Sequence, residues 1–169
     1  DLKIWGSKIL NPDLTIQSLG CRLNKYFMCT NHNYSGCRDI FYHKSSYKVD
    51  YIHGCSIFFN KEIINKVGLF DESYFLFYED VDFSIKSIEN NILLDICDKS
   101  KVIHKENSTI NEMQYQYYST VNRLKIAKKY FKNKLIFVYL GIFIELVKNI
   151  FLLRFNRNYM ILKKIVYEF

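Results

Sequence analysis

Three stretches in the first part of the chain are predicted to be strands, and apolar and polar residues alternate in one of them, Leu14–Leu19. Two of them, Lys3–Leu10 and Leu14–Leu19, lie on either side of an Asn-Pro-Asp turn signal and predict two strands. The third, Val49–Phe59, predicts a strong strand, and Gly54 at its middle indicates a bulge or the close approach of a ligand. Gly20–Tyr47 has little periodicity, so we expect a long excursion over the surface.

Helices and strands both follow Val49–Phe59. Asn60 is a favourable cap for a short helix that Gly68 ends, and apolar residues at helical spacing begin again at Val81. The predicted elements are helices at Lys61–Val67 and Val81–Glu89, then strands at Ile92–Cys97 and Lys101–His104. With 169 residues, the chain has room for one domain, or for one domain with an appendage.

The last third of the chain is predicted to be helical. Met113–Phe131 reads as a long helix whose apolar face is lined by Met113, Tyr117, Val121, Leu124 and Phe131, with Arg123 and the lysines elsewhere. Leu135–Phe155 is long enough to cross a bilayer, and its 15 Leu, Ile, Val and Phe residues favour insertion by roughly 5 to 9 kcal/mol. Glu145 and Lys148 oppose insertion by about 5 to 7 kcal/mol, so a stable span is not predicted.

The same segment is strongly basic. Lys125–Phe169 has 10 Lys or Arg against 2 acids, whereas the preceding residues are close to neutral. Gly141, Glu145, Lys148 and Asn149 fall on one helical stripe, which is typical of a helix lying in a membrane interface. Because the tail is also apolar, we expect an anionic membrane surface as its partner and no nucleic acid.

Acidic and aromatic residues are densest between Val67 and Asp82, in V-G-L-F-D-E-S-Y-F-L-F-Y-E-D-V-D. Acids cost free energy to bury unless they are paired, whereas aromatics this dense are usually packed, so we expect the wall of a half-buried site. Glu79 and Asp80 stand where a helix begins, and a like-charged neighbour raises the pKa of a carboxyl group. Asp80 is therefore a candidate general base, the alternative being a simple helix cap; Asp82 is expected to be a solvated first-turn acid.

Six phrases of the sequence resemble, in order, the second half of inverting family-2 (GT-A) glycosyltransferases, in particular the rhamnosyltransferase-like branch. They are Lys8–Asp13, Gly54–Ser56, Val67–Glu72, Phe75–Tyr78, Glu79–Asp82 and Val102–His104. The resemblance covers about Lys3–Phe131. It implies a partial GT-A (Rossmann-like) α/β fold, a mixed sheet with flanking helices, at 1–131, followed by a basic amphipathic membrane-associated helical segment at 132–169.

The resemblance also implies roles for individual residues. Asp80 matches the base that takes the proton of the acceptor hydroxyl, with Glu79 beside it, and His104 matches a histidine that completes a divalent metal site for Mn²⁺ or Mg²⁺. Contacts with the substrates are implied at Gly54, Cys55, Asp71 and Tyr78. Structural interpretations stay open: His104 as a strand-end histidine bonded to backbone, Asp71 as a backbone cap, and the aromatic run as core.

The function implied is transfer of a sugar from a nucleotide-sugar donor to a glycan or lipid-linked acceptor, at the cytoplasmic face of the inner membrane. The family's nucleotide-binding half, with its D-x-D, has no room in this chain, so we expect an acceptor-side part that is inactive alone. One alternative is a non-catalytic membrane-surface module, and another is a metal-dependent hydrolase using Asp80, Asp82 and His104. The five cysteines lack zinc-site spacing and are expected to be reduced thiols of a cytosolic protein.

Overall fold

The computed structural model describes residues 2–40, 47–105 and 111–168, with side chains left out at 160 and 164–168. The described residues belong to two compact units. The first comprises the described parts of 1–23, 30–73 and 79–106, and the second those of 24–29, 74–78 and 107–169. The predicted domain boundary between residues 131 and 132 stays a prediction.

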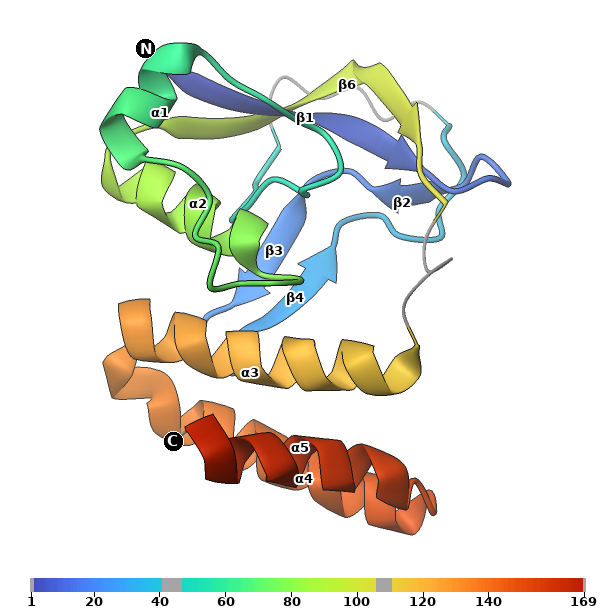
Figure 1. Ribbon diagram of the computed structural model, residues 1–169. Helices are drawn as coiled ribbons and strands as arrows, with labels where there is room; N and C mark the ends of the chain where they lie inside the picture. Colours follow the sequence, from blue (N-terminus) through green and yellow to red (C-terminus); the bar gives the residue numbers. More distant parts are fainter. Residues whose placement is uncertain (1, 41–46, 106–110, 169) are drawn as a thin grey trace. The chain divides into compact units, whose positions relative to one another are not determined.

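The first unit is organised around strand β1 (Lys3–Leu10), to which three other strands bond. β6 (Leu93–Ile103) runs parallel to β1 along its whole length. β5 (Ile57–Phe58) and β2 (Ile16–Ser18) are antiparallel to β1, near its start and its end respectively. Two of these strands, β2 and β6, are labelled beside β1 in Figure 1. This arrangement confirms the predicted α/β class and the mixed sheet.

One irregularity in the sheet explains why the sequence suggested two strands where there is one. Ser7 pairs with Cys97 but Lys8 pairs with Lys101, so β6 carries extra residues at this point. One of them, Ser100, hydrogen-bonds through its hydroxyl to that of Ser7 at 2.9 Å. The polar residues of this bulge interrupt the apolar alternation, although the strand continues through them.

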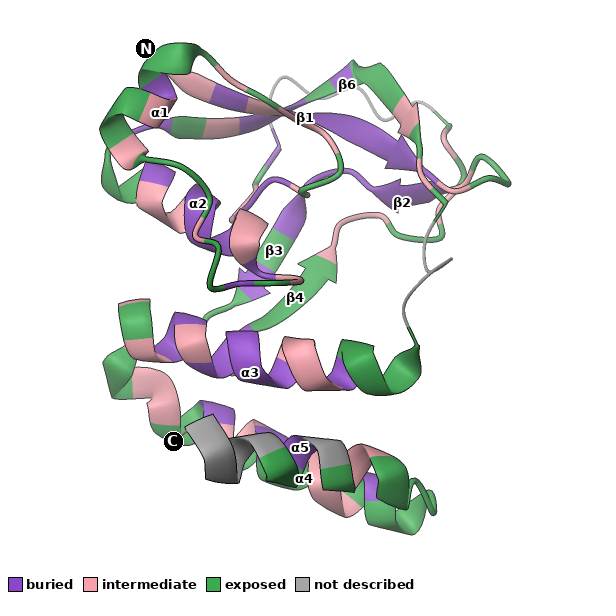
Figure 2. Cartoon of the chain, viewed as in Figure 1, coloured by how far each residue is buried: buried purple, intermediate pink, exposed green. Residues whose placement is uncertain are grey.

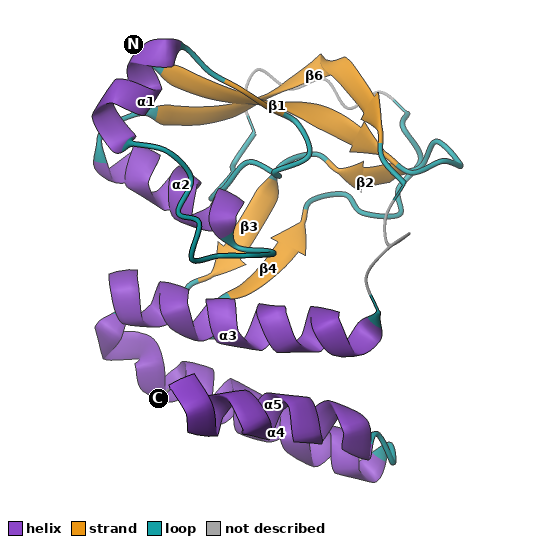
Figure 3. Cartoon of the chain, in the orientation of Figure 1, coloured by secondary structure: helices purple, strands orange, loops and turns teal. Residues whose placement is uncertain are grey.

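Two helices complete the first unit and confirm their predicted positions (Figure 3). α1 (Lys61–Val67) is capped by the Asn60 side chain, which accepts from the Glu62 N–H, and ends at Gly68 with φ of 77°. α2 (Glu79–Glu89) begins two residues earlier than predicted. The helices bury apolar side chains in a core shared with the sheet: Ile4, Leu10, Ile16, Leu19, Tyr47, Ile52, Ile63, Phe83, Ile92 and Ile96.

Two predictions for the first unit are wrong. Val49–Phe59 is not a continuous strand, because the backbone turns at Gly54–Cys55 and only a bridge at Tyr51 and the short β5 remain. Gly20–Tyr47 is not a plain surface excursion, since it contains the paired strands β3 (Cys21–Asn24) and β4 (Cys29–His32). The Asn24 side chain accepts backbone N–H groups of Tyr26 and Phe27 and so favours the turn between them.

The second unit is mainly helical. It contains α3 (Glu112–Tyr130), a short 3₁₀ turn (Lys132–Lys134), α4 (Leu135–Phe151) and α5 (Phe155–Glu168). The region is helical, as predicted, but the predicted segment Leu135–Phe155 is interrupted after Phe151, and a second helix begins at Phe155. Within the described ranges, no helix combines the length and hydropathy that crossing a membrane would require.

The buried face of α3 matches the predicted one at Val121 and Leu124 and differs from it at Met113 and Arg123. Figure 2 shows that its middle turns are buried while its first turn is exposed. Met113, predicted to be part of the apolar face, is 42% exposed, whereas Arg123, predicted to lie elsewhere, is buried. The reason is that Arg123 has an ion-pair partner in α4, which compensates the cost of removing its charge from water.

Candidate active site

The carboxylate of Asp80 is held at the first turn of α2 by two backbone N–H groups. Its Oδ2 accepts from Gly54 N at 2.8 Å, and its Oδ1 accepts from Val81 N at 2.8 Å. Asp80 thus bonds the start of α2 to the turn that replaces the predicted strand. The cap interpretation is therefore correct in part, but the side chain is also bonded to a distant segment, 26 positions earlier in the chain.

Burial, with a smaller contribution from the neighbouring charge of Glu79, raises the pKa of Asp80 to about 7. The hydrogen bonds from Gly54 and Val81 stabilise the ionised form and oppose this shift only in part. A carboxyl group with a pKa near the pH of the cell exists in both protonation states there. This property suits a group that must take up a proton during a reaction.

Glu79 contributes a second carboxyl group next to Asp80. Burial raises the pKa of this carboxyl group as well. Its Oε2 is buried, and among the residues that the structure describes it has no hydrogen-bond partner. Gly54 lies against both acids, since a Cβ atom placed on it would lie 3.4 Å from Asp80 Oδ2 and from Glu79 Oε1.

Three histidines lie in a row beside the Gly54 turn. The ring of His53 is 5.0 Å from that of His32 and 5.9 Å from that of His104, centroid to centroid. Burial, aided by both neighbouring rings, lowers the pKa of His53 to about 4. His53 Nδ1 accepts from Cys55 N at 3.2 Å, a bond that fixes the turn around Gly54.

His53 was not predicted as a site residue from the sequence. Its position directly before Gly54, which was predicted, is the feature that could have indicated it. His104 was selected, and the structure places it at the end of β6, where its backbone N–H bonds Leu10 O and its Nδ1 lies 2.8 Å from Gln17 Oε1. Glu79, Asp80, Gly54, Cys55 and His104 are thus all part of the first unit.

The other predicted site residues have structural partners. Asp71 Oδ1 accepts from Ser73 N at 3.1 Å and so forms a local turn, as the structural interpretation expected. Tyr78 belongs to the second unit, where its buried hydroxyl donates to Met28 O at 2.7 Å. Burial raises the pKa of Tyr78, so it stays neutral at physiological pH.

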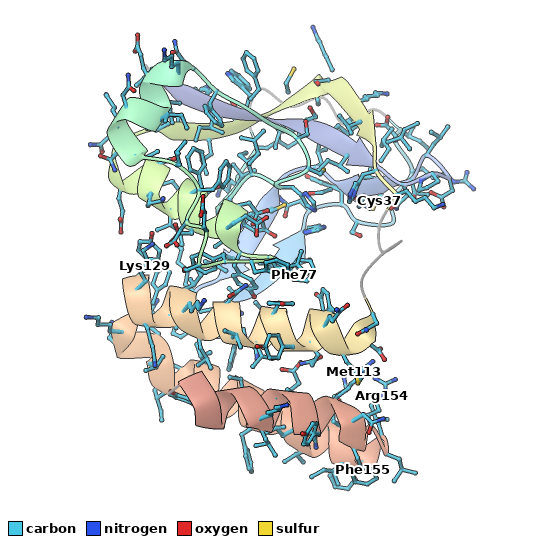
Figure 4. All side chains as sticks on the ribbon, in the orientation of Figure 1. Cys37, Phe77, Met113, Lys129, Arg154 and Phe155 are labelled. Carbon is cyan, nitrogen blue, oxygen red and sulfur yellow. The ribbon has the colours of Figure 1, made fainter. Side chains whose placement is uncertain are left out.

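Tyr78 ends an aromatic loop, residues 74–78, that has an unusual backbone. Phe77, labelled in Figure 4, and Tyr78 have φ values of 64° and 71°, which residues other than glycine rarely adopt. The Asn122 amide of α3 holds this conformation by donating to the carbonyl groups of Leu76 and Phe77 at 2.7 and 2.8 Å. Strained backbone of this kind is often found at functional sites.

Asp82 is not the solvated acid that was expected. It is fully buried, and its Oδ2 pairs with Lys86 Nζ at 3.4 Å across one turn of α2. Residues two positions apart in a helix point to nearly opposite sides, so Asp80 and Asp82 do not act as a pair. The hydrolase hypothesis therefore lacks its second carboxylate.

The described residues do not by themselves make a metal site. In the ranges 2–40, 47–105 and 111–168 there is no group of three or more His, Cys, Asp or Glu side chains arranged to hold a metal ion. His104 would need additional ligands, so we derive no reaction step through a metal.

Comparisons with known proteins add one distant similarity. No family model matches the chain. The chain is 29% identical over 72 residues to the low-salt glycan biosynthesis hexosyltransferase Agl10 of Haloferax volcanii. The match covers 41% of this chain and 24% of that protein, so the shared part is about a quarter of the relative. The similarity supports a distant relationship to a glycosyltransferase.

Proposed function

We propose that this chain is the acceptor-side part of an inverting GT-A glycosyltransferase of the family-2, rhamnosyltransferase-like type. The observation that carries the proposal is the Asp80 carboxylate, anchored by the Gly54 N–H and raised in pKa to about 7. The distant hexosyltransferase similarity supports the same reaction class independently. The reaction would move a hexosyl group from a nucleotide-sugar donor to a hydroxyl group of a glycan or lipid-linked acceptor.

In this proposal Asp80 is the general base. The acceptor hydroxyl oxygen attacks the anomeric carbon of the donor from the side opposite the phosphate, so the new bond has the inverted configuration. The bond from the anomeric carbon to the phosphate oxygen breaks, the nucleoside diphosphate leaves with the bonding electrons, and Asp80 takes the hydroxyl proton. In this proposal Glu79 acts on the base and not on the acceptor, because its Oε2 is buried and its charge helps to raise the pKa of Asp80.

The donor-binding part and the metal are supplied from outside the described residues in this proposal. Mn²⁺ or Mg²⁺ would stabilise the charge on the departing diphosphate, and His104 would be one of its ligands. Because the chain spans about a quarter of its relative, we expect the fragment alone to be inactive. The acceptor belongs to cell-surface polysaccharide synthesis and is reached from the cytoplasmic face of the membrane.

The test is sugar transfer by the full-length protein that contains this chain, with Asp80→Asn as the variant. Nucleoside diphosphate release is measured from UDP-, GDP- and dTDP-sugars with membrane lipid extract as the acceptor source. Loss of a general base lowers turnover by roughly 10² to 10⁴, and we expect a loss in this range. Glu89→Gln, at the exposed end of α2, is the matched control and should retain activity.

Equal turnover by Asp80→Asn and the unaltered protein would remove Asp80 from this role. The second candidate function is a non-catalytic module at the membrane surface, and the exposed apolar face of α4 favours its membrane part. Absence of nucleoside diphosphate release from the unaltered protein, with every donor and with Mn²⁺ or Mg²⁺ present, would favour that second function.

A further inference from the structure

Helix α4 presents an apolar face to solvent. Its exposed positions are Ile136, Phe137, Leu140, Phe143, Ile144, Lys148, Ile150 and Phe151, and Lys148 is the one charged residue among them. They recur at three- and four-residue intervals, so they form one continuous stripe along the helix. Phe151 is 82% exposed and Phe143 61%, fractions that are costly for residues of this size in water.

Two polar residues of α4, Glu145 and Asn149, point into the unit instead. Glu145 Oε2 pairs with Arg123 Nη2 at 3.0 Å, and its Oε1 accepts from Gln116 Nε2 at 2.9 Å, both on α3. Asn149 is buried on the same side. A surface helix of a soluble domain normally turns its apolar face to the core and its polar face to water. In α4 the contacts of Glu145 with α3 turn polar groups inward and leave the apolar stripe facing outward.

Exposed apolar residues and cations also follow α4 along the chain. Leu152 and Leu153 at the following turn are exposed, as are Phe155, Tyr159 and Leu162 of α5. Arg154 and Phe155, labelled in Figure 4, stand together at the start of α5. Four cations are exposed in the same part of the chain: Lys148 on α4, Lys163 on α5, Lys132 in the 3₁₀ turn before α4, and Arg154 directly before α5.

We infer that the outward face of α4 inserts into the surface of a bilayer that contains anionic phospholipids. Apolar side chains would enter the acyl region while the neighbouring cations meet the phosphate groups, the combination typical of interfacial helices. A second copy of the chain is a poorer occupant, because Lys125–Phe169 has a net charge of +8 in each copy. The inference names the partner that the proposed function leaves general, but vesicle binding requires neither Asp80 nor a sugar donor.

The experiment measures binding of the full-length protein to vesicles of phosphatidylcholine, with or without phosphatidylglycerol, by co-sedimentation. The variant Phe143→Ser with Ile144→Ser should bind the anionic vesicles at least about tenfold more weakly, since two anchors are lost. The matched control is Phe58→Ser on β5, because Phe58 is 74% exposed but lies in the first unit. It should bind like the unaltered protein.

The charged part of the inference is tested in the same assay. Lys148→Gln with Arg154→Gln should weaken binding to anionic vesicles by about fivefold per cation and leave binding to pure phosphatidylcholine nearly unchanged. Raising the salt from about 0.05 to about 0.5 M should reduce the preference for anionic vesicles. Asp80→Asn should bind as the unaltered protein does, which separates this inference from the proposed catalysis.

Three results would overturn the inference. The first is vesicle binding that Phe143→Ser with Ile144→Ser leaves unchanged while circular dichroism shows a native fold. The second is failure of the unaltered protein to bind either vesicle. The third is self-association in sedimentation velocity that the double variant abolishes, which would assign the face to a second copy.

Discussion

The raised pKa of Asp80 has a consequence for stability that needs no knowledge of the substrates. The unfolded chain holds this carboxyl group at a pKa near 3.8, and the folded protein at about 7. The folded state therefore binds more protons than the unfolded state between these values, so the free energy of unfolding falls as pH rises from about 4 to about 7. Asp80→Asn removes the ionisable group, so its free energy of unfolding should not show this fall between about pH 4 and about pH 7.

The shift of about three pKa units corresponds to at most about 4 kcal/mol, at about 1.4 kcal/mol per unit. Asp80 is half-buried rather than sealed from water, so we discount this limit to about 2 kcal/mol. The variant also loses a negative charge that stabilises the N-terminus of α2, which reduces its gain in the free energy of unfolding by about 0.5 kcal/mol. The asparagine carbonyl can still accept from Gly54 N, but its NH2 group cannot accept from Val81 N, which costs about another 0.5 to 1 kcal/mol. Asp80→Asn should therefore be more stable than the unaltered protein at pH 8 by roughly 0.5 to 1 kcal/mol.

Urea unfolding followed by circular dichroism, at about pH 4 and about pH 8, measures this difference. The gain should be present at the higher pH and nearly absent at the lower one, where the Asp80 carboxyl group is neutral in both states. Glu89→Gln, on the same helix but exposed, should change the free energy of unfolding by less than about 0.5 kcal/mol at both. A variant that is destabilised at pH 8, or stabilised equally at both, would refute the reasoning.

Two further predictions concern the groups that position the site and the aromatic loop. His53→Leu removes the acceptor of the Cys55 N–H, so it should loosen the Gly54 turn and raise the midpoint of the Asp80 ¹³C carboxyl titration in NMR. His53→Asn, whose side-chain oxygen replaces Nδ1 as the acceptor, should restore the original midpoint. Equal midpoints in all three proteins would contradict this prediction. Asn122→Ala removes two hydrogen bonds to the carbonyl groups of the strained loop 74–78 and should lower the free energy of unfolding by about 2 kcal/mol, whereas a loss under about 0.5 kcal/mol in urea unfolding would mean that the amide does not hold the loop.

Local signals along the chain predicted the elements whose ends are set by neighbouring residues. Helix α1 begins and ends where Asn60 and Gly68 indicate, because a cap acts over one turn and needs no tertiary partner. The strand β1 matches its predicted bounds, Lys3–Leu10, and the Asn-Pro-Asp turn signal directly after it marks its end. Both features are consequences of nearby sequence alone.

The failures occur where distant residues decide the backbone conformation. Val49–Phe59 has the composition of a strand, but its Gly54 N–H is bonded by Asp80 from 26 positions away, so the chain turns there. Arg123 reads as a surface cation, but Glu145 of another helix makes its burial possible. Such pairings depend on the fold as a whole and leave no periodic pattern in the sequence.

The two acids of the candidate site, Glu79 and Asp80, could be predicted from the sequence, but the histidine that lies beside them, His53, could not. Glu79, Asp80, Gly54 and His104 were selected because ordered phrases of the sequence resemble a known family. His53 belongs to no such phrase, and its importance follows from contacts with Cys55 and with two other rings. The amphipathic stripe of α4 was predicted, but the pairing of Glu145 with Arg123 of α3 was not, because an amphipathic pattern does not say which face is turned inward.

The pH dependence of sugar transfer tests the role of Asp80 most directly. With the donor that the full-length protein uses, kcat/KM reports the ionisation of the free enzyme's base. It should rise about tenfold per pH unit below about pH 7 and level off above it, because Asp80 must be ionised to accept the hydroxyl proton and has a pKa of about 7. A kcat/KM that is constant from about pH 5 to about pH 8 would contradict a base at this position.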